Sequence, residues 1–480
     1  MNELDYCIIG SSAAAAGAVE GVRAVDPSGT LAVITEETVP FYSRPLITRV
    51  MTGAATALDV AYRPRTFLDE NRVLTYIGEP VVRLDPADRR IILASGKELR
   101  FRKALVATGN SPKLPPLPGL NLRGVHTLMS LADAEAIAAD LGLNGLNGPG
   151  PGPDPRPRVS SVVVIGGGLI GLQAAEALCS MGLRVTVVEG LARLLATVLD
   201  QTTSTMVADI FALHGVTILT SRSVKALRAG RADPDRVGSV VLADGTELPA
   251  DLVILATGVR PRTEILETAT GGPGRGFRVD GQMATDDPEI YAAGDAAEVP
   301  DLLRGGARPF PIWPTAYAGG RVAGLNMAGR RAALAGQVAM NTFHFFGLAM
   351  ASAGLVEPPG AGDGGDGAGG GGDGAGDGGE YEILATHRPP GVPGRLSRPS
   401  GPSGPSPGET YYRKLVLRKG CLVGLVCVGE AVDRAGLAVS LIRQGVEVES
   451  FKEELLGSFS LAGLPEEIRA KYLSGEGVLS

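Results

Sequence analysis

The chain twice shows a pattern in which a short run of apolar residues ends at a glycine and a helical stretch follows. In the first copy, DYCIIGSSAAAAGAVEGVRAV, the apolar run over 6–9 breaks at Gly10, and a second run, LAVIT, leads to Glu36. A strand, a glycine turn, a helix and a strand bring backbone N–H groups and a helix N-terminus to one point, where a pyrophosphate can bind. The pattern therefore predicts a nucleotide-binding unit over these residues.

The glycine spacing of this first unit is incomplete. Gly10 occupies the first glycine position, but Ser12 and Ala15 stand where the second and third glycines are usual. Small side chains still let a backbone approach a ligand, so the departure weakens the prediction without excluding it.

The second copy, SSVVVIGGGLIGLQAAEALCSMGLRVTVVEG, is complete. Its first apolar run leads into Gly166, Gly168 and Gly171 with GxGxxG spacing, and its last strand ends at Glu189. An acidic side chain at that place accepts hydrogen bonds from both ribose hydroxyls of a dinucleotide. The same carboxylate repels a 2′-phosphate, so we expect NADH to be preferred over NADPH by about one to three orders of magnitude. The alternative for either unit taken alone is a doubly wound sheet that binds no nucleotide.

Composition narrows the class of protein. A chain of 480 residues exceeds one ordinary domain, and two or three are expected. The net charge of −7 argues against nucleic acid or an anionic membrane as a partner. No apolar run approaches the roughly 20 residues that span a bilayer, and no basic segment opens the chain. We therefore expect a cytoplasmic protein without a membrane partner.

The four cysteines occur without CxxC or CxxxxC spacing, at Cys7, Cys179, Cys421 and Cys427. Cys7 and Cys179 lie in apolar segments and are expected to pack as small buried hydrophobes. The sequence therefore predicts no disulfide framework and no metal site.

Three further stretches make the pattern specific. LVATGNSP at 105–112 and ILATGVRPR at 254–262 are paired strand-to-turn segments, and TDDPEIYAAGDAAE occupies 285–298. With the two glycine units, and in this order, they resemble the two-dinucleotide-binding flavoproteins, the superfamily of the pyridine nucleotide–disulfide oxidoreductases. The resemblance is to the type of the NADH:rubredoxin and ferredoxin reductases and the flavin domain of NADH-dependent nitrite reductase. It extends over roughly residues 3–330, and YYRKLVLRKGCLVGLVCVGEAVDRAGLAVSLIRQG looks more loosely like the third domain of that superfamily.

The resemblance implies an α/β fold with two Rossmann-like dinucleotide-binding domains, for FAD and NAD, and a C-terminal α+β domain. A Gly/Asp-rich loop at 360–379 and a Pro/Ser/Gly-rich loop at 389–408 are expected to protrude from the C-terminal domain. The expected domains are the FAD-binding domain at 1–120 and 251–335, the NAD(P)-binding domain at 121–250 and the C-terminal domain at 336–480.

The resemblance also implies the residues that hold the cofactors. The first glycine turn would lie along the FAD pyrophosphate, Glu36 would bind the adenosine ribose, and Asp295 would bind the ribityl chain. The sole tryptophan would lie at the flavin edge, with a place in the core as the alternative. The FAD set is Gly10, Ser12, Ala13, Ala15, Glu36, Arg44, Val81, Thr108, Gly109, Gly294, Asp295 and Trp313. The NAD set is Gly166, Gly168, Leu169, Ile170, Gly171, Glu189 and Gly258.

The stretch VPFYSRPLIT at 39–48 follows the FAD-binding glutamate and contains no cysteine. In the resembling disulfide reductases a redox CxxxxC follows here, but Ser43 cannot form a disulfide or a charge-transfer thiolate. Arg44 and Pro45 instead match the arginine and proline that pack at the flavin in rubredoxin and ferredoxin reductases. We infer that electrons leave the flavin directly for an external acceptor.

Two positions depart from the family pattern, which has lysine where Arg49 stands and glutamate where Gln173 stands. The hypothesis is an Arg–Gln contact near the reactive flavin nitrogen that raises the flavin potential, because arginine stays charged and glutamine is neutral. The alternative is that neither side chain touches the flavin.

The expected function is transfer of electrons from NADH through FAD to an acceptor such as rubredoxin, ferredoxin or a partner subunit. One alternative is a flavin subunit of a larger oxidoreductase, such as a 2-oxoacid dehydrogenase complex. Another is a flavin- and NADH-dependent binding or sensor protein with little turnover. The sequence names no acceptor, and the C-terminal domain can serve either a homodimer contact or a cover over the flavin.

Overall fold

The structure is a computed structural model that describes residues 3–143, 159–269, 275–358, 381–387, 412–429, 432, 435–457 and 465–473. The chain divides into two compact units, Met1–Val188 with Ser223–Gln337, and Glu189–Arg222 with Val338–Ser480. The two predicted loops at 360–379 and 389–408 lie outside the described residues. The domain boundaries expected from the sequence stay a prediction.

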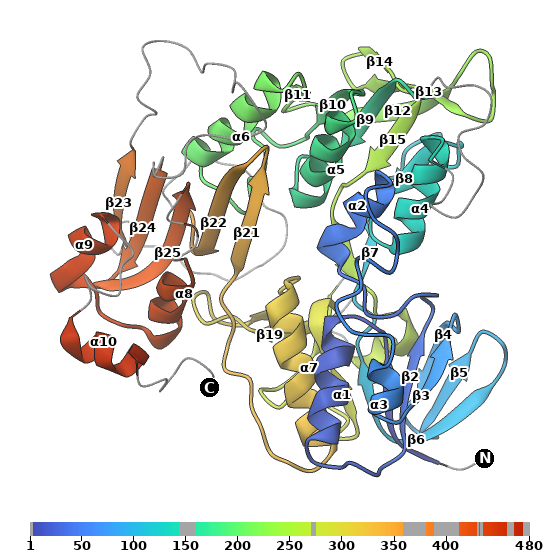
Figure 1. The fold of residues 1–480 in the computed structure, drawn as a ribbon, viewed down its shortest axis with the longest axis vertical. Coiled ribbons are helices and arrows are strands. Elements are labelled where there is room, and N and C mark those ends of the chain that lie inside the picture. Colours follow the sequence, from blue (N-terminus) through green and yellow to red (C-terminus); the bar gives the residue numbers. More distant parts are fainter. Residues whose placement is uncertain are drawn as a thin grey trace. The chain divides into compact units, whose positions relative to one another are not determined.

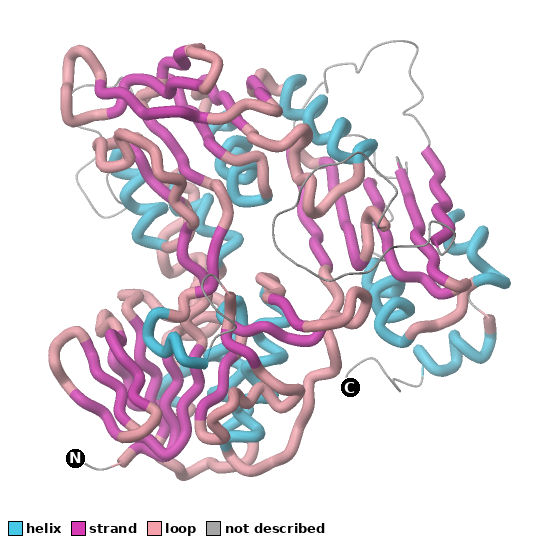
Figure 2. Tube along the Cα trace, turned by 180° about the vertical axis from the view of Figure 1, so that it is seen from behind, coloured by secondary structure: helices cyan, strands magenta, loops and turns pink. Residues whose placement is uncertain are grey.

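The first unit contains a mainly parallel sheet (Figures 1 and 2). Its strands lie in the order β3-β2-β1-β6, with β18 paired in parallel to β6 and an antiparallel pair, β4 and β5, at the other edge. Nearly all residues of β1 and β2 are buried, so both faces of the sheet must be covered by other elements. The strands are β1 Leu4–Ile9, β2 Leu31–Thr35, β3 Val73–Ile77, β4 Val81–Asp85, β5 Arg90–Leu93, β6 Glu98–Val106 and β18 Ile290–Ala292.

Helices α1 (Ala13–Arg23) and α7 (Trp313–Met327) pack side by side in this unit (Figure 1). A Cβ added at Gly320 of α7 would lie 1.9 Å from the carbonyl oxygen of Ala14, so only glycine permits this approach. The remaining short elements here are η1 Arg44–Leu46, α2 Ile47–Met51, α3 Phe67–Glu70, η2 Glu264–Ala269, β17 Phe277–Arg278, η3 Gly294–Ala296, β19 Ala297–Pro300 and β20 Ala307–Arg308.

A second parallel sheet in the same unit contains the other glycine pattern. Its strands lie in the order β10-β9-β15-β8, and α5 follows β9 directly after the glycine turn. A short antiparallel pair, β7 and β16, belongs to the segments that connect the two halves. The elements are β7 Asn110–Pro112, β8 Val125–Thr127, α4 Leu131–Asp140, β9 Ser161–Ile165, α5 Leu169–Ser180, β10 Arg184–Val188, β12 Val224–Ala229, β13 Val237–Leu242, β14 Glu247–Pro249, β15 Leu252–Leu255 and β16 Val259–Pro261.

The second unit is built on an antiparallel sheet in the order β21-β22-β25-β24-β23, with α8 packed on β25 and β22. Helix α6 belongs to this unit and contacts the sheet through the rings of Phe211 and Phe345, whose centroids are 5.2 Å apart. The elements are α6 Gln201–Leu213, β11 Thr217–Leu219, β21 Met340–Phe345, β22 Leu348–Gly354, β23 Tyr381–His387, β24 Tyr412–Arg418, β25 Cys421–Val428, α8 Ala435–Gln444, η5 Glu449–Phe451, α9 Lys452–Gly457 and α10 Glu466–Leu473.

These sheets confirm the predicted class, α/β with two Rossmann-like units and a C-terminal α+β part. All four cysteines are free. None of the helices in the described ranges has the length and apolar character needed to cross a bilayer.

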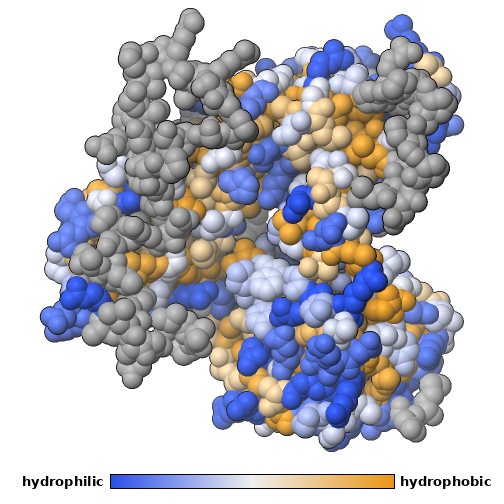
Figure 3. All heavy atoms as spheres, viewed as in Figure 1, coloured by the Kyte–Doolittle hydropathy of each residue, from blue (hydrophilic) through white to orange (hydrophobic). Residues whose placement is uncertain are grey.

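On the face shown in Figure 3, hydrophilic residues gather over the part of the first unit that contains α1 and α3. Hydrophobic residues lie scattered among them, as is usual on the surface of a folded unit.

Candidate functional site

The glycine turn after β1 has a conformation that only glycine adopts easily. Gly10 has φ +125°, and an added Cβ would lie 2.2 Å from the carbonyl oxygen of Ala107. Ser12 is the N-cap of α1, so the turn leads directly into a helix N-terminus, whose first N–H groups have no partner within the helix. The structure thus forms the anion-binding arrangement that the pattern predicts.

A cavity of about 390 Å³ opens beside this turn, where the strand ends of the first sheet meet. It is lined by the turn itself, by the end of β2, by the turn after β6 and by the segment after β18. The predicted residues that line it are Gly10, Ser12, Ala13, Glu36, Arg44, Pro45, Val81, Thr108, Gly109, Gly294, Asp295 and Trp313. Ala15 does not line it, because its side chain is buried within α1.

Two acceptor groups lie side by side in the cavity wall. Asn110 Nδ2 donates to Asp295 Oδ2 at 3.0 Å, while Asn110 Oδ1 is buried and has no hydrogen-bond partner among the described residues. Burial raises the pKa of Asp295 to about 6, although the charge of Arg44 and the bond from Asn110 oppose the shift. A ligand that brings hydroxyl donors would satisfy both groups.

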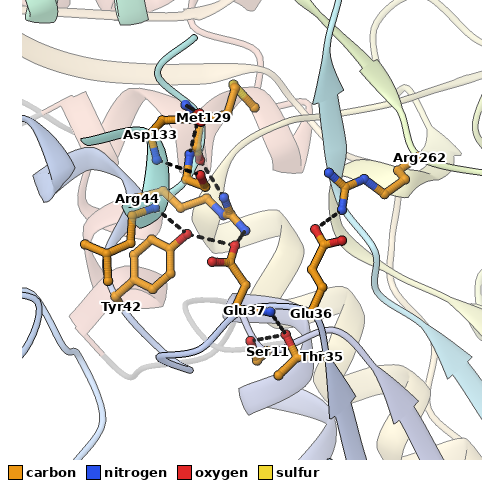
Figure 4. A network of polar contacts seen from close by, with 11 residues as sticks. Ser11, Thr35, Glu36, Glu37, Tyr42, Arg44, Met129, Asp133 and Arg262 are labelled. Carbon is orange, nitrogen blue, oxygen red and sulfur yellow. Dashed lines mark hydrogen bonds and ion pairs between the residues drawn. The ribbon is translucent and has the colours of Figure 1, made fainter. Parts of the chain in front are cut away.

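Arg44 is held by contacts with two other segments (Figure 4). Its guanidinium donates to the Met129 carbonyl oxygen at 2.6 Å and to Glu37 Oε1 at 3.0 Å. Tyr42 donates to the same Glu37 oxygen at 2.9 Å and accepts the N–H of Leu131 at 3.2 Å. Burial raises the pKa of Tyr42, so its hydroxyl stays a donor. This network joins the end of β2 to the segment between β8 and α4.

Glu36 forms an ion pair with Arg262 (Figure 4). Arg262 follows β16, and its backbone is tied to the turn after β6, because its N–H donates to Gly109 and its carbonyl oxygen accepts from Thr108 Oγ1. The carboxylate assigned to the adenosine ribose therefore already has one cationic partner.

Trp313 lines the cavity with 40% of its surface exposed. Its ring stacks on Tyr317 with centroids 5.5 Å apart, and Tyr62 meets it edge-on at the same distance. The placement favours the flavin-edge interpretation over a place in the core, and its role stays a prediction.

Arg49 and Gln173 do not line the cavity. Arg49 is exposed on α2 and Gln173 is half-buried on α5, and these two helices pack against each other. No hydrogen bond joins the two side chains in the part of the chain that the structure describes, and their proposed effect on the flavin stays a prediction.

The second glycine turn repeats the geometry of the first. Gly166 has φ +115°, and an added Cβ would lie 2.2 Å from the Ala256 carbonyl oxygen. A Cβ at Gly171 would lie 2.1 Å from the Gly166 carbonyl oxygen, so helix α5 can approach only with glycine there. Gly168 is the N-cap of α5, and Leu169 and Ile170 are half-buried in its first turn.

Gly258 lies in the turn after β15 with φ +100°, and an added Cβ would meet no atom within 4 Å. Glu189 follows β10 directly in the chain, and its Oε1 accepts the N–H of Leu191 at 2.7 Å. The backbone can therefore be approached at Gly258, and a hydrogen bond fixes the carboxylate of Glu189. The NAD roles of these residues stay predictions.

Several lining residues were not predicted from the sequence. The Asp133 carboxylate accepts the N–H groups of Met129 and Ser130 at 2.8 and 3.2 Å, and the Ser130 hydroxyl caps α4 in return. The SLAD spacing is a readable signal of a helix start, but it does not reveal the cavity beside it. The unpredicted lining residues include Ser11, Glu37, Asn110, Thr127, Met129, Ser130, Asp133 and Arg262.

The cavity fits FAD on two observations. The turn at Gly10 brings the N-terminus of α1 to the cavity wall, where its first N–H groups can bind a pyrophosphate. The buried oxygen of Asn110, which has no partner among the described residues, lies beside Asp295, as the hydroxyls of a ribityl chain need.

The chain matches the pyridine nucleotide-disulphide oxidoreductase family over residues 4–320. It belongs to this family. The predicted superfamily and the oxidoreductase class are confirmed, as are the electron-transfer function and the FAD and NAD(P)H cofactors.

Known relatives agree with this assignment. The chain is 33% identical over 362 residues to the NADH-dependent phenylglyoxylate dehydrogenase subunit epsilon of Aromatoleum evansii. The aligned residues cover 75% of this chain and 81% of that protein. It is 33% identical over 298 residues to the 5,5'-dehydrodivanillate O-demethylase ferredoxin reductase subunit of a Sphingobium species, covering 62% and 68%. Among solved structures, a NAD-dependent persulfide reductase from A. fulgidus superposes with a TM-score of 0.76 at 25% identity, covering 93% and 78%.

Proposed function

We propose that this family member transfers electrons between NADH and another protein through FAD, without a redox-active thiol. The observation that carries the proposal is the cavity wall: Arg44 and Pro45 line it, and none of its described lining residues is a cysteine. The cysteine nearest in sequence to this segment, Cys7, is fully buried in β1, and burial raises its pKa to about 12. It is therefore a poor nucleophile at neutral pH.

The side chains of the cavity have separable roles in this proposal. The N–H groups at the start of α1 would hold the pyrophosphate, Glu36 the adenosine ribose, and Asp295 with Asn110 the ribityl hydroxyls. Arg44, fixed by Glu37 and the Met129 carbonyl oxygen, keeps a positive charge in the wall. FAD, when bound, supplies the hydride acceptor and the means to release electrons one or two at a time.

NADH would bind at the second glycine turn. Helix α5 begins at Gly168 and offers its N-terminal N–H groups to the pyrophosphate. The preference for NADH over NADPH rests on Glu189 and stays a prediction.

The proposed partner is a protein. Two relatives named above are subunits of larger enzymes, a dehydrogenase acting on phenylglyoxylate and an O-demethylase system. The relative with the wider coverage favours a partner subunit of a 2-oxoacid-oxidising complex, and the other favours a ferredoxin-like carrier. The cytoplasmic location and a homodimer stay predictions.

An anaerobic titration of the purified full-length protein with NADH tests the proposal. We expect bleaching to be complete at one NADH per FAD, without a long-wavelength thiolate charge-transfer band. NADPH should be about tenfold to a thousandfold weaker. Uptake of a second equivalent would reveal a further redox centre and would contradict the thiol-free assignment.

Reoxidation of the reduced flavin distinguishes an electron-transfer enzyme from a binding or sensor protein. Rapid steady-state reduction of a one-electron dye supports an electron-transfer enzyme, whether free or docked as a subunit. Rapid bleaching by NADH that no dye reverses would instead support the binding or sensor alternative.

A further inference from the structure

Arg262 is one of the residues that line the cavity. It follows β16, whose Pro261 pairs with Asn110 of β7. Its own N–H donates to the Gly109 carbonyl oxygen at 2.9 Å, and its carbonyl oxygen accepts from Thr108 Oγ1 at 2.6 Å. The backbone of Arg262 is therefore fixed against the turn that lines the cavity, independently of its side chain.

The side chain reaches the end of β2, 226 residues away in sequence, where Arg262 Nη1 donates to Glu36 Oε1 (Figure 4). The two side chains are 34% and 49% exposed. Among the described residues, Glu36 Oε2 has no hydrogen-bond partner, so one oxygen of the carboxylate is held and the other stays available. A carboxylate can accept at both oxygens at once.

An exposed glutamate has several rotamers, and orienting it for a ligand costs conformational free energy. A partner with a fixed backbone and a rigid planar guanidinium removes part of that cost before the ligand arrives. Arg262 contacts the carboxylate assigned to the adenosine ribose, so the effect should depend on the adenosine half of the cofactor.

We propose that Arg262 is a positioning residue for FAD, which holds Glu36 so that its second oxygen accepts the adenosine ribose hydroxyls. The inference rests on the proposed FAD site. The opposite arrangement, in which Arg262 must leave Glu36 before the ribose can bind, predicts effects of the opposite sign.

The test measures flavin binding rather than turnover. Full-length protein stripped of flavin is titrated with FAD and, separately, with FMN, which lacks the adenosine. Arg262→Gln should weaken FAD binding about tenfold, the scale of one charge-assisted hydrogen bond, and leave FMN binding unchanged. Arg262→Lys should restore part of the loss.

The matched control is Arg260→Gln. Arg260 lies two residues earlier, is 55% exposed, and pairs with Glu264 rather than with a cavity residue. It should leave both flavin affinities unchanged. Near-ultraviolet circular dichroism checks that each variant is folded, and Arg262→Lys tests the same contact if the glutamine variant is not.

A double-mutant cycle separates positioning from direct contact. Glu36→Gln alone should weaken FAD binding, and adding Arg262→Gln should cost little more, because Arg262 acts through Glu36. Fully additive losses, an equal loss for FMN, or tighter FAD binding by Arg262→Gln would each overturn the inference. If the wild-type protein binds no FAD, the proposed function fails with it. If the wild-type protein binds FAD and the Arg262 variants bind it with the same affinity, the inference fails but the proposed function does not.

Discussion

At the scale of single residues, the cavity keeps a carboxylate where burial disfavours its charge. Asp295 has one protein donor, Asn110, and the charge of Arg44 nearby, yet burial still raises its pKa to about 6. Without a ligand to donate further hydrogen bonds, the ionised group costs stability. Binding sites commonly contain groups of this kind, which lower the stability of the ligand-free protein but serve to bind the ligand.

Asp295→Asn should therefore stabilise the flavin-stripped protein at neutral pH. The folded pKa lies above the ordinary value of 3.8, so the folded state binds the proton more tightly, and stability falls as pH rises from about 4 to about 6. A difference of about 2 pKa units corresponds to up to about 3 kcal/mol above pH 6. The measurement is the pH dependence of the unfolding midpoint, and an unchanged slope in the variant would contradict the assignment.

At the scale of elements, helix α1 is held in place because glycines of α7 let the two helices approach each other closely. Gly320 and Gly324 of α7 lie against the backbone of Ala14 and Ala18, where an added Cβ would come within 1.9 and 2.3 Å of carbonyl oxygens. The close contact holds the N-terminus of α1 beside the cavity, so packing and ligand binding depend on the same residues.

Gly320→Ala should destabilise the protein by about 1–3 kcal/mol, because a methyl group forces backbone apart in a packed contact. Gly436→Ala in α8 is the matched control, since its Cβ would meet no atom within 4 Å. That change should be neutral or stabilising by up to about 1 kcal/mol. Thermal unfolding midpoints of the two variants compare them, and equal midpoints would refute the packing argument.

At the scale of the whole molecule, the second unit combines two segments far apart in sequence. Asp200 caps α6 and accepts from Tyr412 at 2.7 Å, while Lys414 lies 3.3 Å away, and all three side chains are buried. Burial alone would raise the pKa of Asp200, but hydrogen bonds from Thr203 and Tyr412 hold it below its usual value. These contacts tie α6 to β24.

Asp200→Asn keeps a good helix cap but removes the charge opposite Lys414. We expect a loss of about 3 kcal/mol at neutral pH, because a buried cation is left without its partner. The loss should shrink as pH falls through the lowered pKa of Asp200, where the wild type loses the same charge. Asp209→Asn, at an exposed position of the same helix, is the control. A flavin spectrum that changes in Asp200→Asn would show that its effect is not confined to this unit.

The amino-acid sequence by itself determined the two nucleotide-binding units and their order. Apolar runs and glycines act locally, since the positive φ of the turn between strand and helix favours glycine at Gly10 and Gly166. The cavity residues in those turns, and Asp295 after its own strand, were therefore readable from short motifs.

Only the tertiary structure decided which distant side chains complete the site. Glu36 meets Arg262 across 226 residues, Arg44 meets the Met129 carbonyl oxygen across 85, and Asp200 meets Tyr412 across 212. A local pattern contains no information on the strand order that brings such segments together, so these partners could not be predicted from it. Short-range backbone geometry is specified by the residues themselves, whereas the pairing of charges depends on how the sheets are assembled.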